Sequence, residues 1–93
     1  GNDIDISMFP NPFNSSLTIN FSNSDDFITN SVSIYSITGK KIQKWFVDTD
    51  NKSNNSLLWT GKDERGFEIR SGLYFVSFES NKKTIIKKIT YLK

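Results

Sequence analysis

The strongest β-strand pattern in this sequence is Gly72-Leu73-Tyr74-Phe75-Val76-Ser77-Phe78-Glu79-Ser80. Tyr74, Val76 and Phe78 occupy every second position, so a strand places them on one face. A second segment, Ser16-Leu17-Thr18-Ile19-Asn20-Phe21, alternates between polar and apolar residues. A period of two is typical of strands with one buried face, so both segments are predicted to contribute to one core.

Further strands lie on both sides of these two segments. A hairpin is predicted over residues 31–47, where Gly39 supplies the positive φ that a tight turn needs. Other strands are expected at residues 4–8, 57–59 and 83–91, and residues 48–56 are expected to form a polar loop. In the last strand, the adjacent apolar residues Ile85 and Ile86 predict a bulge or burial on both faces.

These segments predict an all-β fold. No window has a helical period, and roughly seven short strands with polar turns are typical of an immunoglobulin-like antiparallel β-sandwich. The stretch Phe9-Pro10-Asn11-Pro12-Phe13-Asn14 is expected to form a rigid kink, pinned by Phe9 and Phe13, that turns the chain from one sheet toward the other. The predicted core consists of Leu17, Ile19, Phe21, Val32, Ile34, Trp59, Tyr74, Val76 and Phe78.

Length and charge limit the classes of function. The 93 residues, 35% of them hydrophobic, predict one domain over residues 1–93. Gly1 is interpreted as a cleavage scar, so we expect the chain to come from a longer protein. The net charge of +2, from 12 Lys+Arg against 10 Asp+Glu, is too balanced to indicate nucleic acid as a partner. No apolar run approaches the about 18 residues of a membrane span.

The residue types disfavour catalysis and metal binding. The sequence has no Cys and no His, which removes Ser-His-Asp and Cys-His catalysis and thiolate zinc sites. Its paired acids, Asp25/Asp26, Asp48/Asp50 and Asp63/Glu64, fall in expected loops and are interpreted as solvated. Residues 48–54 begin like a calcium loop, but Lys52 replaces a donor and no Gly supplies the sharp turn. We therefore expect no catalytic residue, no metal site and no cofactor.

A second acidic group, Asp63 with Glu64 and Glu68, is better explained by a turn. Asp63 is expected to hydrogen-bond the backbone two residues on, with Gly66 in the left-handed conformation. The aromatic Trp45 shares alternate positions with Lys41 and Gln43, and is the aromatic that we expect to be exposed for a surface contact. Trp59 alternates with Leu57, which favours the core.

Lysines gather near the end of the chain, at Lys82, Lys83, Lys87, Lys88 and Lys93. Two interpretations stay open here. Lysines on an edge strand discourage aggregation between strands, so the group can be a solvated edge. The same lysines can instead form a strip that docks a partner.

Four motifs occur in a recognisable order: the Pro-rich stretch at 9–14, Val32-Ser33-Ile34-Tyr35-Ser36-Ile37-Thr38-Gly39-Lys40, Trp59-Thr60-Gly61-Lys62-Asp63-Glu64-Arg65-Gly66, and Ser71-Gly72-Leu73-Tyr74-Phe75-Val76, before a final Lys-rich strand. Together they resemble the type A C-terminal sorting domain of the type IX (Por) secretion system of Bacteroidetes-type bacteria. They are closely similar to the immunoglobulin-like domain of the flagellar hook-cap family as well. Ser36 stands at a position, before the Thr-Gly turn, where the sorting family often has Asp. Thr60, directly after Trp59, stands at a second position where that family often has Asp.

The resemblance implies a non-catalytic sorting domain at the end of a secreted cargo protein. Its implied partners are the outer-membrane secretion machinery, a sortase-like peptidase and an N-terminal cargo domain in the same chain, with the cell surface as destination. The positions that carry over as recognition residues are Gly72, Tyr74, Lys83, Lys87, Lys88 and Lys93. The alternative is an accessory spacer or carbohydrate-binding module of a polysaccharide-degrading enzyme, for which Trp45 and a Tyr on one open face would be the sign.

Overall fold

The computed structural model describes residues 4–48 and 54–93, and these form an all-β structure. Apolar residues at alternate positions give the strands one buried face each, and the turns between them are polar. The strands are β1 (Asp5–Phe9), β2 (Leu17–Ser22), β3 (Ser31–Ser36), β4 (Lys41–Phe46), β5 (Asn54–Trp59), β6 (Gly72–Glu79) and β7 (Thr84–Tyr91).

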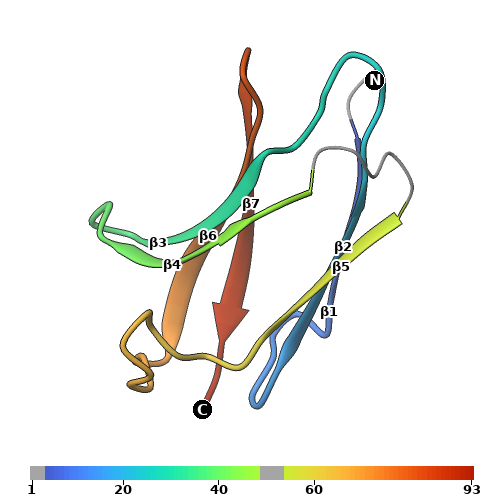
Figure 1. The fold of residues 1–93 in the computed structure, drawn as a ribbon. Coiled ribbons are helices and arrows are strands. Elements are labelled where there is room, and N and C mark those ends of the chain that lie inside the picture. Colours follow the sequence, from blue (N-terminus) through green and yellow to red (C-terminus); the bar gives the residue numbers. More distant parts are fainter. Residues whose placement is uncertain (1–3, 49–53) are drawn as a thin grey trace.

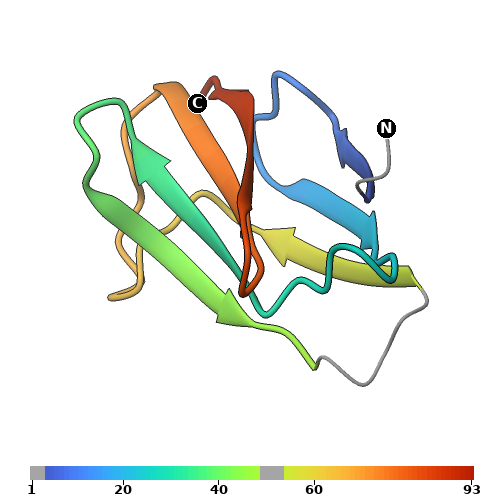
Figure 2. The same ribbon diagram turned by 90° about the horizontal axis from the view of Figure 1, so that it is seen from above.

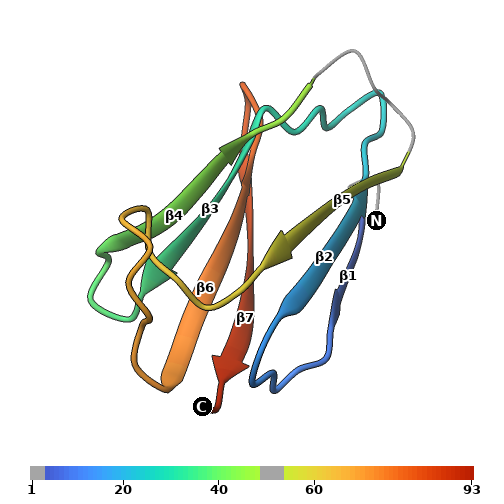
Figure 3. The same ribbon diagram turned by 60° about the horizontal axis from the view of Figure 1, so that its bottom comes forward.

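The strands form two antiparallel sheets that face each other as a sandwich (Figure 1). One sheet has three strands in the order β1-β2-β5, and the other has four in the order β4-β3-β6-β7 (Figure 3). This arrangement is that of an immunoglobulin-like sandwich, as the sequence predicted. The hairpin between β3 and β4 turns at Gly39, whose φ is +87°.

The core lies between the sheets. All nine predicted core residues are buried, and β2 shows the reason: Leu17, Ile19 and Phe21 are buried while the residues between them are partly exposed. The core includes other side chains that were not predicted, among them Phe13 and Phe27 from connecting segments. No periodicity marks such residues, because they lie outside regular strands.

Aromatic rings join the two sheets at one end of the sandwich. The ring of Phe13 lies 4.9 Å from that of Tyr91 on β7 and 5.3 Å from that of Trp59 on β5. The ring of Trp59 in turn lies 5.9 Å from that of Tyr74 on β6. Gly61 has a φ of +72°, and a Cβ there would lie 3.0 Å from the Tyr91 ring. The close packing therefore requires a residue without a side chain at this position.

The Pro-rich connection differs from its prediction. It does not carry the chain between sheets, because β1 and β2 are paired neighbours in the same sheet, with Phe9 opposite Thr18. Instead it reaches across to the end of β7, where Phe13 forms a parallel bridge with Tyr91 (Figure 2). Only one of the two phenylalanines is buried, since Phe13 is 1% exposed and Phe9 49% exposed.

Two strand details also need correction. β5 begins at Asn54, inside the expected polar loop, because Asn54 to Ser56 pair with β2. The Ile85–Ile86 pair marks neither a bulge nor burial on both faces: the β6–β7 register is continuous, Ile85 packs against the core, and Ile86 is 61% exposed. The irregularity lies instead between β3 and β4, at Ile34/Tyr35.

The core predicts the cost of truncating its central aromatic residue. Phe78 is fully buried, with its ring 5.5 Å from that of Phe21, so Phe78→Ala should lower the free energy of unfolding by about 3–5 kcal/mol. Urea unfolding followed by tryptophan fluorescence measures this. The control is Phe46→Ala, because Phe46 is 83% exposed and its loss should stay within about 0.5 kcal/mol. Equal costs at the two positions would contradict the assignment of the core.

Candidate docking surface

The last strand, β7, is an edge strand. It pairs with β6 along its whole length, from Gly72 opposite Tyr91 to Glu79 opposite Thr84. In an edge strand, every second residue directs its backbone N–H and C=O away from the sheet. At Thr90 these outward groups are occupied, since its N–H donates to Asn11 Oδ1 at 3.0 Å and its carbonyl accepts from Phe13 N at 3.0 Å. The end of this edge is therefore closed by the Pro-rich connection.

The same alternation identifies the open part of the edge. Thr84, Ile86 and Lys88 have the parity of Thr90, so their backbone N–H and C=O groups also point outward. Within residues 4–48 and 54–93, no hydrogen bond reaches these outward groups. Beyond them, Leu92 N donates to the carbonyl of Phe13 at 2.8 Å, which completes the closed end. A segment of five positions, from Thr84 to Lys88, is thus available for pairing.

The predicted lysines surround this open segment. Lys83, Lys87 and Lys88 are all exposed. Lys87 lies on the face of β7 that carries Ile89, whereas Lys88 lies on the outer face opposite Phe75. Lys83 precedes the strand, and its Nζ lies 6.0 Å from the ring of Phe27. The edge is therefore flanked by positive charge on both faces.

Lys93 has a different environment from these three. Its Nζ forms an ion pair with the carboxylate of Glu68, and its backbone N–H donates to Ser71 Oγ at 2.9 Å. The hydrogen bond and the charge of Lys93 lower the pKa of Glu68, and the carboxylate raises the pKa of Lys93 in return. Lys93 therefore holds the end of the chain against the connection between β5 and β6.

Tyr74 and Gly72 serve the fold. Tyr74 is buried, and its hydroxyl donates to the carbonyl of Arg70 at 2.7 Å. This contact, from a tyrosine near the start of a strand back to the backbone just upstream, is the tyrosine corner of immunoglobulin-like domains. Burial raises the pKa of Tyr74. Gly72 begins β6 with a φ of +153°, a conformation that residues with a side chain rarely adopt.

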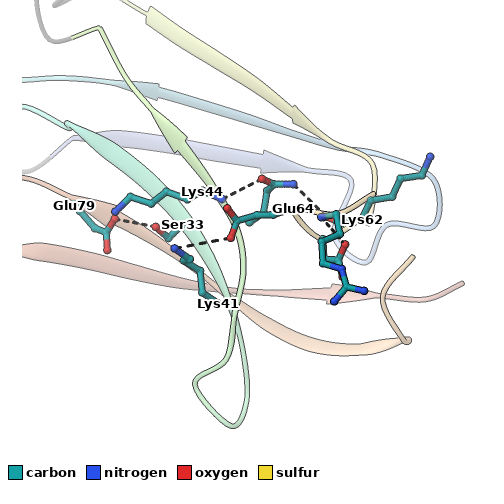
Figure 4. Close-up of polar contacts among 9 residues, drawn as sticks. Ser33, Lys41, Lys44, Lys62, Glu64 and Glu79 are labelled. Carbon is teal, nitrogen blue, oxygen red and sulfur yellow. Dashed lines mark hydrogen bonds and ion pairs between the residues drawn. The ribbon is translucent and has the colours of Figure 1, made fainter. Parts of the chain in front are cut away.

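The acidic residues of the β5–β6 connection have structural contacts. Asp63 Oδ1 accepts from the backbone of Arg65 at 2.9 Å and of Phe67 at 3.0 Å, which is the predicted Asx-type turn. Gly66 has a φ of +88°, as expected. Glu64 pairs with Lys41 at 3.9 Å (Figure 4). In the part of the chain that the structure describes, no three acidic residues gather as metal ligands; most of the 48–54 loop lies outside that part.

Trp45 is less exposed than expected. It lies opposite Val32, a core residue, and packs against the core as a partly buried side chain. The exposed aromatic residue of β4 is its neighbour Phe46, with Lys44 Nζ 5.2 Å from the Phe46 ring. The prediction failed because the irregularity at Ile34/Tyr35 shifts the facing of β4 relative to simple alternation.

A family comparison explains this combination of features. The family model for the secretion system C-terminal sorting domain matches residues 7–91. The chain belongs to this family. A comparison with curated proteins finds no significant match. Among solved structures, the chain is similar to PorZ, an essential bacterial surface component of the type IX secretion system of Porphyromonas gingivalis. The TM-score is 0.66 at 18% identity, and the match covers 95% of this chain and 11% of the PorZ chain.

The sorting domain is a C-terminal signal for type IX secretion, which directs cargo across the outer membrane to the cell surface. The described residues contain no helix of the length and apolarity that crossing a membrane requires. At one of the two positions where the sequence departs from the family pattern, Ser36 takes over the turn contact: its Oγ accepts from Lys40 N at 3.1 Å.

Because Tyr74 forms the tyrosine corner, we expect its substitution to lower the stability of the fold and to have no direct effect on recognition. Tyr74→Phe should lower the free energy of unfolding by about 1 kcal/mol, because the bond to Arg70 is lost while the ring stays. Thermal and urea unfolding measure this, with Tyr35→Phe as the matched control on a partly exposed ring. A Tyr74→Phe variant that keeps full stability yet abolishes export would show a recognition role instead.

The ion pair at Lys93 predicts a change in titration. Lys93→Gln should raise the pKa of Glu68 toward its ordinary value, whereas Lys93→Arg should keep it low. Carboxyl chemical shifts followed by NMR against pH measure both. Because the folded-state pKa is lowered, the contribution of Glu68 to stability is present above its unfolded pKa and is lost as the pH falls through the folded value. An unchanged Glu68 titration in Lys93→Gln would refute the pairing.

Proposed function

We propose that the secretion machinery recognises this sorting domain by adding a strand to the open edge of β7. The observation that supports this is the set of outward backbone groups at Thr84, Ile86 and Lys88, which have no partner among the described residues. Strand addition uses main-chain hydrogen bonds for affinity and neighbouring side chains for specificity. The closed end at Thr90 gives the added strand a defined stopping point.

The lysines beside the edge supply the specificity in this proposal. Lys87 and Lys88 extend from opposite faces of β7, and Lys83 lies just before it. A partner strand with acidic residues would be attracted and held in register, whereas a basic one would be repelled. Lys93 and Tyr74 contribute indirectly, because they hold the adjoining connection and core in place.

Several finer features accompany this proposal. The sorting domain is of type A, has no enzymatic activity, binds no cofactor or metal, and forms one unit over residues 1–93 at the end of a cargo protein. A sortase-like peptidase is a further partner in this proposal. The likeness to the immunoglobulin-like domain of the flagellar hook-cap family is one of architecture. These features rest on the sequence resemblance and on the absence of Cys and His.

The alternative, a carbohydrate-binding or spacer module, has less support. Carbohydrate binding would need Trp45 and a tyrosine on one open face. Tyr35 lies on the outer face of the four-stranded sheet, opposite Phe75 and Lys41. Trp45 lies opposite Val32 on the core-facing side. The two rings therefore do not form one platform, which favours the docking function.

Export of a reporter tests the proposal. Residues 1–93, fused behind a periplasm-directed reporter in a host with type IX secretion, should bring the reporter to the cell surface. Ile86→Pro removes one outward N–H at a position where an edge strand tolerates proline, so surface exposure should fall sharply. Ile86→Val is the matched control for this edge, because it keeps both the N–H and an exposed apolar side chain. Equal export of the two variants would rule out strand addition.

Charge is tested separately. Lys87→Glu with Lys88→Glu should reduce export while stability changes by no more than about 0.5 kcal/mol, since both side chains are exposed. Thermal unfolding of the purified variants provides the control for folding. Deletion of residues 87–93 is unsuitable, because it removes the buried residues Ile89 and Tyr91. A wild-type fusion that remains in the periplasm would contradict the sorting role of this chain.

A further inference from the structure

The outer faces of the two sheets differ in chemistry. Outward positions of β1, β2 and β5 carry mainly Asp, Ser, Thr and Asn, as in the rows Asp5–Ser22–Asn54 and Ser7–Asn20–Ser56. In the third row, the exposed apolar residues Phe9 and Leu58 lie apart, on either side of Thr18. The outer face of the four-stranded sheet instead carries Tyr35 opposite Phe75, with Ile86 on the next strand. A solvent-exposed face of an antiparallel sheet is ordinarily polar, as most of the first sheet's outer face is. The second face is therefore the unusual one.

Four apolar residues of this face form one patch. The outer-face patch consists of Tyr35, Ile37, Phe75 and Ile86, which together with Ser36 and Gly39 line a shallow hollow of about 330 Å³. Ile37 and Ile86 are 68% and 61% exposed, so nothing in the described structure covers them. Contiguous exposed apolar surface of this kind is characteristic of interaction sites.

The charges on this face are mainly positive. Lys88 lies directly opposite Phe75, at the border of the hollow, and Lys44 lies on the same face opposite Ser33. The acid among the outward positions of these four strands is Glu79. Its Oε1 accepts from Ser33 Oγ at 2.9 Å (Figure 4). The same oxygen accepts from Ser31 Oγ at 2.7 Å, so both hydroxyls hold the carboxylate on the sheet.

We propose that the outer-face patch docks an extended, acidic–apolar segment of a protein partner. An apolar side chain of that segment enters the hollow, and an acidic side chain two residues along contacts Lys88. The inference rests on the proposed function, because the partner is the one that pairs with the edge of β7. Ile86 and Lys88 belong to both surfaces: their side chains lie on the patch and their outward backbone groups form the edge.

A protein segment suits these features better than the other occupants. The hollow receives a side chain, and the adjoining edge offers backbone groups that another strand can match. A second copy of this chain would place the same lysines against each other, since a two-fold interface pairs a surface with itself. A lipid surface would use the lysines and the apolar residues but would leave the strand edge unpaired.

Peptide titration of the purified domain tests the proposal. The probe is an extended synthetic peptide in which Ser alternates with Leu and Glu, so that Leu and Glu fall on the same side. It should bind saturably and shift the NMR amide signals of Ile37, Phe75 and Ile86. The same peptide with Lys in place of Glu should not bind. Binding of both peptides alike, or of neither, would overturn the proposal.

A patch variant gives the matched comparison. Tyr35→Thr with Ile37→Thr removes apolar surface without touching β7 and should weaken peptide binding by about tenfold. The control is Phe9→Thr with Leu58→Thr, which removes exposed apolar surface of similar size from the other sheet and should leave binding unchanged. Thermal unfolding confirms that both variants are folded.

Other outcomes separate this proposal from the proposed function. If Ile86→Pro abolishes peptide binding while the patch variant binds normally, strand addition stands and the patch inference fails. Saturable shifts at the patch with phosphatidylglycerol vesicles, and none with the Leu–Glu peptide, would assign the surface to lipid. A concentration-dependent dimer in analytical ultracentrifugation, lost in the patch variant, would assign it to a second copy. Either result would overturn the protein-segment proposal.

Discussion

The packing of Phe13 between the two sheets is the contact on which the position of β7 depends. We refer to this buried side chain as the Phe13 wedge. Its ring fills the space between Trp59 on one sheet and Tyr91 on the other, while its backbone pairs with Thr90 and Leu92. One residue therefore contributes to the hydrophobic core and to the hydrogen bonding of β7. Aromatic contacts of this type contribute beyond the area that they bury, and backbone bonds at a sheet edge order a strand that would otherwise fray. The position of β7, and of everything that it presents, follows from this wedge.

The two sheets that this residue joins differ in the surface that they expose. The three-stranded sheet is mainly polar on its outside, whereas the four-stranded sheet carries the open edge, the lysines and an apolar patch on its outer face. The connection between β5 and β6 supports the second sheet from one end, through Glu68 with Lys93 and Arg70 with Tyr74. The residues predicted for recognition therefore fall into two groups. Residues such as Tyr74 are buried or paired within the domain and stabilise the fold. The others are exposed and lie beside backbone groups that have no hydrogen-bond partner in the described structure.

Alternation along the chain was sufficient to predict the strands and nine buried residues, because each strand carries its own signal of burial. It was not sufficient for Phe13, whose burial depends on a loop that meets a strand almost eighty positions later. The same limit explains the start of β5, where Asn54 and Ser56 have no strand preference and are ordered by β2. Trp45 was misjudged because the irregular pairing of β4 with β3, which leaves Ile42 without a partner position, changed the facing along β4. The lysines near β7 were found from composition, whereas the distinction between Lys93 and the others needed the position of Glu68.

The closure of β7 by the Pro-rich connection has a consequence for how the domain behaves in a crowded periplasm. An exposed, fully open edge allows identical chains to add to one another without limit, which is the route to fibres. Here the free edge ends at Thr90, so a strand from another molecule cannot pair with β7 beyond that residue. Any pairing is confined to a short stretch flanked by like charges, where identical copies repel each other. A secreted cargo can thus keep an adhesive edge for its transporter while it remains soluble on the way there.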